Sequence, residues 1–197
     1  MSAAYRALPR DLAGPRSPGW WGVVLLIANE AALFGALLTG YFYLRASAPA
    51  WPLGGLEPPD LVLPGLNTVL LLTSSAAIAW AEHSVIHDHR GRLRLGLALA
   101  FILGAAFVAV QAVEYSRETF APQVNAYSSL FYTITGFHGA HVAVGLLMLI
   151  VVFIRAMRGH FAAGRYEAVS NVAIYWHFVD VVWLAVFTSL YVTPYLR

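Results

Sequence analysis

The sequence predicts an all-α, polytopic membrane protein with five transmembrane helices, and three observations support this fold class. Hydrophobic residues make up 59% of the chain and charged residues only 11%, whereas a soluble domain carries about 25% charged residues. Five segments each hold the roughly 20 mainly apolar residues that a helix needs to cross a bilayer. These segments are too long for barrel strands and lack their period-two alternation, so helices are the remaining way to satisfy the backbone in lipid.

The five spans are expected, in chain order, at residues 20–44, 62–80, 93–115, 130–154 and 172–192. The chain then divides into a polar N-terminal segment, 1–19, and a transmembrane domain, 20–197. The first apolar run exceeds the roughly 7–15 residues of a signal-peptide core, so this span is expected to be retained. The connection 46–60 is rich in proline and is expected to be an extended connection on the outer surface.

Arginine placement predicts the orientation of the chain. All twelve basic residues are arginines, and nine lie on one side of the predicted membrane: Arg6, Arg10, Arg16, Arg90, Arg92, Arg94, Arg155, Arg158 and Arg165. The other side carries Arg45, Arg117 and Arg197. The positive-inside rule therefore places the N-terminus in the cytoplasm and the C-terminus outside. A net charge of +2 is too small to argue for a nucleic-acid partner, and the absence of cysteine excludes disulfides and thiolate metal sites.

Glu30 is the deepest acid in the predicted spans, and an ionisable group at that depth needs a partner or a purpose. With a rise of about 1.5 Å per residue, Glu30 lies about 15 Å from the inner end of span 1 and His141 about 20 Å from the inner end of span 4. The two side chains can meet if these spans are neighbours. Glu30 is interpreted as a functional carboxyl that binds a lipid headgroup or relays protons. The alternative is a structural glutamate hydrogen-bonded inside the bundle.

His138 and His141 are three residues apart and share a helix face. Gly136 and Gly139 are expected to let another helix approach closely there. Histidine commonly binds haem, copper or zinc, but no acid neighbours this pair, and His177 lies near the inner end of span 5. We therefore expect His138 and His141 to be structural histidines that form hydrogen bonds, and we expect no metal site.

Two further polar groups lie at or near the predicted inner boundary. In span 5, His177 and Asp180 are three residues apart, where an ion pair or polar network between them would lower the cost of burying each. Arg155 ends span 4 and His160 follows it. Arginine at this level pairs well with lipid phosphate, and ordinary snorkelling is the alternative. The sequence has no phosphate-binding loop, nucleophile elbow or zinc-protease helix, so no catalytic residue is predicted.

Two stretches closely resemble the signature of the cytochrome c oxidase subunit III family. They are FYTITGFHGAHVAVG at 131–145 and YWHFVDVVWLAVFTSLY at 175–191. Weaker matches occur in the family's order: ANEAALFGALLTGYFYLRA from Ala28, LNTVLLLTSSAAIAWAEH from Leu66 and QAVEY from Gln111. The chain is similar to the five-helix form of the family, because its first span resembles the third helix of the seven-helix form.

The resemblance implies a non-catalytic subunit of a proton-pumping haem-copper terminal oxidase, which reduces O2 to water in aerobic respiration. Such a subunit has no cofactor of its own, since the haems and copper belong to partner subunits. It packs mainly against subunit I, with subunit II in the same complex, in a bacterial cell membrane. It holds phospholipid in a V-shaped cleft and supports proton uptake. Positions matching the family's lipid or polar-cleft residues are Glu30, His141, Arg155 and His160. Positions matching its structural polar residues are His138, His177 and Asp180.

Several alternatives stay open at this point. A quinol-oxidase subunit III and a nitric-oxide-reductase accessory protein belong to the same family, although glutamate at position 30 favours cytochrome c as the electron donor. A haem-binding electron-transfer protein and a small proton transporter using Glu30 and His141 represent different classes. One position departs from the family: the acid often found six residues before Trp176 is Ser170 here, and Glu167 lies three residues earlier.

Overall fold

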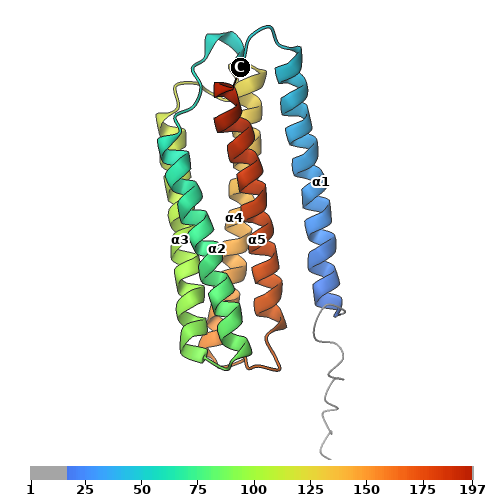
Figure 1. Cartoon of the computed structure of the whole chain (residues 1–197), viewed down its shortest axis with the longest axis vertical. Helices are drawn as coiled ribbons and strands as arrows, with labels where there is room; N and C mark the ends of the chain where they lie inside the picture. Colours follow the sequence, from blue (N-terminus) through green and yellow to red (C-terminus); the bar gives the residue numbers. More distant parts are fainter. Residues whose placement is uncertain (1–16, 197) are drawn as a thin grey trace, which may run out of the picture.

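The computed structural model describes residues 17–196, and in that range it contains five long helices and no β-strand. Figure 1 shows them running alternately up and down. They are α1 (Pro18–Ser47), α2 (Val62–Ile86), α3 (Arg90–Arg117), α4 (Ala126–Met157) and α5 (Glu167–Phe187). All five are long and apolar enough to cross a membrane, which confirms the predicted fold class. Of the predicted segment 1–19, residues 1–16 lie outside the described part, and with them Arg6, Arg10 and Arg16.

The helices extend beyond the predicted apolar spans because their ends carry capping and charged residues. Helix α1 begins after Ser17, whose hydroxyl accepts a hydrogen bond from the backbone N–H of Trp20 at 3.1 Å, and proline occupies its first position. Helix α4 begins with a capping box, in which Asn125 and Ser128 each accept the other's backbone N–H. Helix α5 continues through a π-helical turn, Thr188–Val192, and a 3-10 turn, Thr193–Tyr195.

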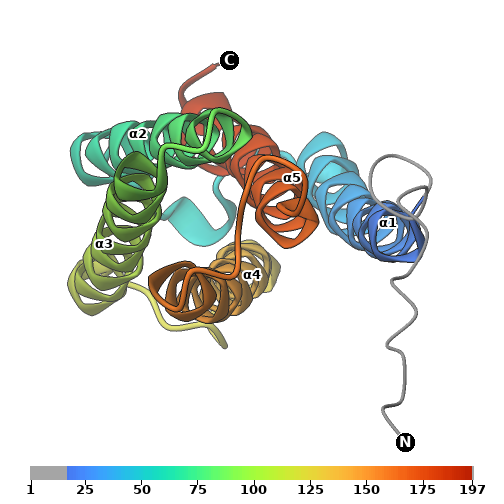
Figure 2. The same ribbon diagram turned by 90° about the horizontal axis from the view of Figure 1, so that it is seen from below.

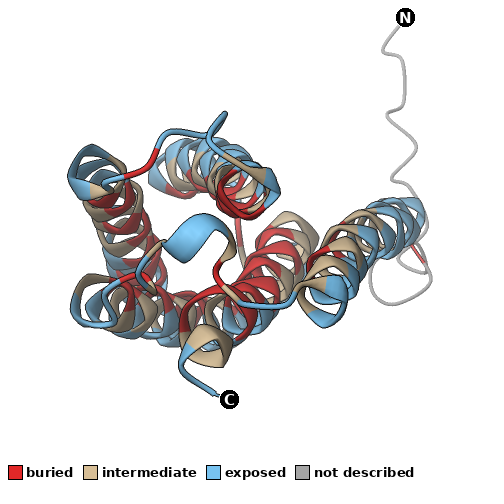
Figure 3. Ribbon diagram, turned by 90° about the horizontal axis from the view of Figure 1, so that it is seen from above, coloured by how far each residue is buried: buried red, intermediate tan, exposed pale blue. Residues whose placement is uncertain are grey.

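Four of the helices form a ring, and α1 stands outside it. Seen along the helix axes in Figure 2, α2, α3, α4 and α5 surround a common interior, while α1 lies beside α4 and α5. The C-terminus and the connections 48–61 and 118–125 lie at one end of the molecule, which we call the C-terminal face; the opposite face carries the connections 87–89 and 158–166. Figure 3 shows the connection 48–61 crossing the ring at the C-terminal face.

Trp176 of α5 is the centre of the four-helix ring. It is 0% exposed, and its indole Nε1 donates a hydrogen bond to Ser74 of α2 at 2.9 Å. Gly104 of α3 and Gly145 of α4 lie against its ring, and an added Cβ would come within 2.6 Å and 2.8 Å of ring atoms. One side chain therefore joins all four helices, and two glycines provide the room for it.

A third glycine sets the spacing of α2 and α3. A Cβ on Gly96 would lie 2.8 Å from Ala81 Cβ and 2.9 Å from the carbonyl of Ala77, so these backbones are in close contact. The close helix approach expected at Gly136 and Gly139 is not found within residues 17–196. A Cβ on Gly139 meets nothing within 4 Å, and one on Gly136 meets only the hydroxyl of Tyr115, at 3.9 Å. These two glycines face outward on α4, away from its packed side.

Candidate functional site

The first candidate site is a polar pair between α1 and α4. His141 Nε2 lies 2.8 Å from Glu30 Oε2, and the two side chains are 14% and 17% exposed. The structure thus brings together the two residues that depth alone placed at a similar level. His141 Nδ1 lies 2.6 Å from the carbonyl of Phe137, which can only accept. The His141 imidazole therefore bridges the Phe137 carbonyl of its own helix and the Glu30 carboxyl of α1.

His138 occupies a different environment from His141. Its imidazole is 1% exposed and lies among the rings of Phe34, Phe107 and Trp183, with centroid distances of 6.4, 5.6 and 5.0 Å. Neither ring nitrogen has a hydrogen-bond partner within residues 17–196. The expected structural hydrogen bonds of His138 are absent there, because the turn of α4 that carries it faces the aromatic interior of the ring.

His177 and Asp180 do not bond to each other, contrary to the expected pair. The ring Nδ1 of His177 lies 2.5 Å from the hydroxyl of Ser75 on α2. Both carboxylate oxygens of Asp180 are buried without a hydrogen-bond partner, although Ser75 is also a neighbour of this carboxyl. The polar contact therefore joins α5 to α2. Spacing within one helix could not reveal it, because the partner comes from another helix.

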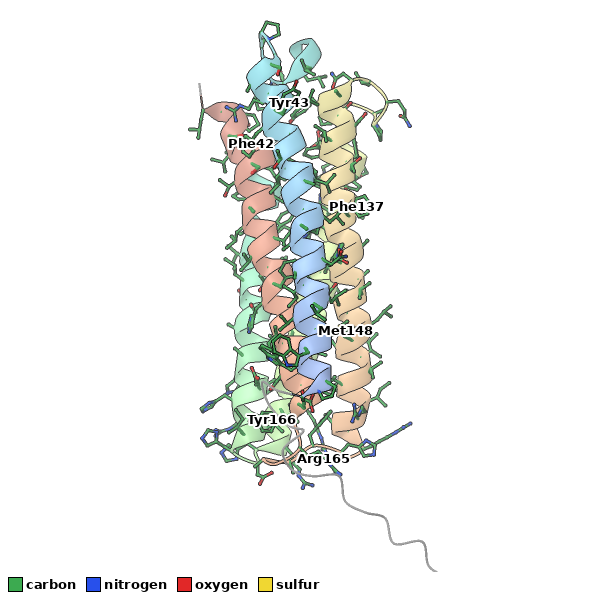
Figure 4. The ribbon with its side chains drawn as sticks, turned by 90° about the vertical axis from the view of Figure 1, so that its right-hand side faces the viewer. Phe42, Tyr43, Phe137, Met148, Arg165 and Tyr166 are labelled. Carbon is green, nitrogen blue, oxygen red and sulfur yellow. The ribbon has the colours of Figure 1, made fainter. Side chains whose placement is uncertain are left out.

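An apolar groove runs from this pair toward the opposite face, between α1, α4 and α5. Its volume is about 450 Å³, and its lining includes Val23 of α1, Leu147, Met148 and Val151 of α4 and Val172 of α5. Figure 4 shows Met148 where α4 passes α1, with Arg165 at the end of the molecule below it. The Glu30–His141 pair lies about one turn beyond the upper lining residue, Val144.

The groove ends in a polar pocket at the opposite face. This pocket has a volume of about 350 Å³ and shares Arg155, Ala168 and Asn171 with the groove. The Arg155 guanidinium lies 5.2 Å from the ring centre of Phe161, a cation–π distance. Two guanidinium groups, from Arg155 and Arg165, therefore border this end of the apolar groove.

Sequence reasoning missed three of the groove and pocket residues, Arg165, Glu167 and Asn171. His160, which it did name, is exposed, and its backbone carbonyl accepts a hydrogen bond from Arg165 Nε at 2.8 Å. Glu167 accepts a hydrogen bond from the buried hydroxyl of Ser17, which ties the start of α1 to the start of α5. In the sequence, Glu167 stands out only as an acid three residues before Ser170, the position where the chain departs from the family. Its hydrogen-bond partner, Ser17, lies 150 residues away and could not be predicted.

Comparison with known proteins identifies the family. A family model described as cytochrome c oxidase subunit III matches residues 18–195, which include all five helices. The chain belongs to the cytochrome c oxidase subunit III family. Its relatives include cytochrome c oxidase subunit 3 of Tragelaphus oryx, which is 39% identical over 181 residues, 87% of this chain and 68% of the relative. That of Equus caballus is 39% identical over 178 residues with the same coverage, and that of Pylaiella littoralis is 38% identical over 177 residues, 86% and 65% of the two chains.

Membership of the subunit III family confirms the resemblance drawn from the two signature stretches. It makes the chain a haem-copper oxidase subunit III, and thereby part of an oxidoreductase complex in a membrane. Within residues 17–196 no three histidine, cysteine, aspartate or glutamate side chains are arranged to hold a metal ion.

Proposed function

We propose that this chain is a non-catalytic, cofactor-free subunit of a proton-pumping cytochrome c oxidase, and that it works by holding phospholipid beside the catalytic subunit. In this role it stabilises subunit I and sustains proton uptake during turnover, while the haems and copper stay in partner subunits. Multi-pass insertion in a bacterial cell membrane, with the N-terminus cytoplasmic, completes the proposal. The opposite face is then the cytoplasmic face.

The observation that carries the proposal is the continuity of pair, groove and arginines. The polar pair lies about one turn beyond the upper end of the groove, apolar side chains line the groove, and Arg155 and Arg165 border its other end. A phospholipid matches this arrangement, because a charged phosphate lies at one end of its apolar acyl chains. Arg155 forms no ion pair within residues 17–196, so its donors are available for a phosphate, which guanidinium groups bind well.

Native mass spectrometry of the purified oxidase tests the lipid site. We expect the wild-type complex to retain phospholipid after detergent exchange and R155Q to retain less, because one guanidinium is lost. R158Q is the matched control, since Arg158 is a neighbouring arginine that lines neither the groove nor the pocket. Equal lipid retention in R155Q and the wild type would contradict the proposal.

Turnover measurements test the supporting role of the pair. We expect E30Q to keep normal haem spectra and an initial rate of O2 reduction near that of the wild type, but to lose activity sooner during sustained turnover. The physical reason is that a glutamine amide can still donate a hydrogen bond to His141 but cannot form a charge-assisted one, so α1 is held less firmly beside α4. Loss of the oxidase spectra in a fully assembled E30Q complex would instead indicate a direct part in the chemistry.

Cysteine labelling tests the orientation, and the chain is suited to it because it contains no cysteine. G164C places one thiol in the connection at the opposite face, and G55C places one in the connection at the C-terminal face. In intact spheroplasts we expect a membrane-impermeant maleimide to label G55C and to leave G164C unlabelled until the membrane is opened. The reverse pattern would overturn the proposed orientation.

A further inference from the structure

A second apolar groove lies between α3 and α4, which are neighbours in the ring (Figure 2). It has a volume of about 230 Å³ and opens to the outside of the ring, where Ile102 is 60% exposed. Its lining is apolar throughout and consists of Ala98, Phe101, Ile102, Leu149, Ile150 and Phe153. It shares no residue with the groove between α1, α4 and α5, so α4 has an apolar groove on each of two sides.

Two arginines of α3 lie at the end of this groove that is nearer the opposite face. Arg94 is four residues before Ala98 and is therefore on the same side of α3, about one turn closer to that face. Its Nε donates a hydrogen bond to the carbonyl of Ala156, in the last turn of α4, at 3.3 Å. Arg90 lies one turn further on, and a Cβ added to Gly159 would be 4.0 Å from its Nη1. Both guanidinium groups therefore reach the end of α4 beside the groove.

The positive charge of these two arginines is not balanced by the described part of the chain. The only ion pair within residues 17–196 is that of Glu30 with His141. Asp88, the acid nearest to both arginines in the sequence, accepts the backbone N–H of Ala163 at 3.1 Å. A guanidinium has five N–H donors in a planar fork, and the contact with α4 uses one donor of Arg94. The remaining donors can bind a phosphate, which suits the geometry of the fork.

We propose that the groove between α3 and α4 binds an anionic phospholipid, with one acyl chain in the groove and the phosphate at Arg94 and Arg90. The apolar lining packs against the chain by dispersion contacts, and the guanidinium groups lie about one helical turn from the lining, where the phosphate follows the chain. The unbalanced positive charge favours a lipid with a net negative charge over a zwitterionic one, whose own amine the arginines repel.

The competing explanation for these arginines is that they only stabilise the end of α4. Cations near a helix C-terminus interact favourably with its dipole and its unpaired carbonyls, and the contact of Arg94 with Ala156 is of this kind. That role needs neither the apolar groove nor a second arginine, and it predicts no preference between lipids. The lipid site is separate from the groove of the proposed function and does not depend on it.

Native mass spectrometry tests the proposal on the full chain, purified in detergent and titrated with phosphatidylglycerol and phosphatidylcholine in equal amounts. We expect the wild type to bind phosphatidylglycerol in preference to phosphatidylcholine. R94Q should bind it about tenfold more weakly at this site, because charge-assisted hydrogen bonds to the phosphate are lost. A98F keeps both arginines but fills the groove, and it should lose the same lipid.

R92Q is the matched control, since Arg92 is exposed and lies two residues from Arg94, on another side of α3. It removes the same charge and should bind lipid like the wild type. Circular dichroism and gel filtration establish that each variant is folded, and R90Q takes the place of R94Q if that variant does not fold. In R94Q/R155Q we expect the losses from the two grooves to add, so each site is read separately.

Three results would each overturn the proposal. If R94Q binds phosphatidylglycerol as tightly as R92Q does, the arginines serve only the end of α4. If folded A98F keeps the lipid, the arginines hold an anion without any acyl chain in the groove. If the wild type binds the two lipids equally, the site does not select a negative headgroup.

Discussion

Helix α1 and the four-helix ring are held in place by different physical means. In an apolar stretch of 18 residues within Glu167–Tyr195, which contains α5, 56% of the residues are buried. In the corresponding stretch of α1, only 6% are buried. The ring is held by side-chain packing around Trp176. Helix α1 buries only Phe34 and Tyr41, and polar contacts hold it at three further points: Ser17 with Glu167, Glu30 with His141, and Arg45, which donates to the carbonyl of Leu196 at 2.7 Å.

The difference explains where the groove is. Between two polar attachment points the faces of α1 and α4 need not interdigitate, which leaves room for the apolar groove there. Within the ring the same gap would cost the packing energy of the lining side chains. Loss of a ring contact should therefore destabilise the whole subunit, whereas loss of an α1 contact should change its position and leave the ring folded.

W176A should have the largest effect. It leaves a cavity where four helices meet and removes the partner of Ser74, which should lower the free energy of unfolding by about 3–5 kcal/mol. Chemical denaturation in mixed micelles, followed by circular dichroism, measures this loss. W21A is the control, because Trp21 is 52% exposed and should cost little. Similar losses in the two variants would show that Trp176 is not the centre of the ring.

G145A should destabilise the ring by about 1–3 kcal/mol, because its Cβ would press on the indole of Trp176. The same denaturation assay applies. G139A, on the same helix, places its Cβ in open space and should not destabilise the protein. If both alanine variants unfold at the wild-type denaturant concentration, the tight contact of Gly145 with Trp176 does not limit stability.

H141A should affect α1 more than the ring. It leaves Glu30 without its partner, at a cost of about 1–3 kcal/mol. Spin labels on cysteines introduced at Leu25 of α1 and Val181 of α5, both exposed, should then give a broader distance distribution. The double variant E30L/H141A should recover a narrow distribution, because no polar group is left unpaired. An unchanged distribution in H141A would show that the pair does not position α1.

E118Q should give the smallest effect and only at neutral pH. The pKa of Glu118 is raised above its ordinary 4.5, so the folded chain binds this proton more tightly than the unfolded chain. Stability contributed by this group is therefore complete in acid and falls as the pH rises through the folded pKa. E118Q should raise the thermal midpoint at about pH 7 and leave it unchanged at about pH 4. A gain of equal size at both pH values would assign the effect to something other than titration.

Sequence reasoning succeeded where one helix or one periodicity decides the outcome. Run length and composition give the five helices, and rise per residue placed Glu30 and His141 within one turn of each other's depth. It failed where the partner comes from another helix. Ser75 for His177 and Ser17 for Glu167 depend on which faces meet. For the same reason, close helix contact was expected at Gly136 and Gly139, whereas the structure has it at Gly104 and Gly145. The sequence alone does not tell which glycine lies opposite a large side chain of another helix.

The late position of the partners of α1 has a consequence for biogenesis. Helix α1 is the first of the five to leave the ribosome, yet His141 and Glu167 are synthesised more than a hundred residues after their partners on that segment. Until α4 is inserted, the nascent chain carries Glu30 in the bilayer without the histidine that contacts it in the folded protein. The first of the five described spans to be made is thus among the last to gain its polar partners.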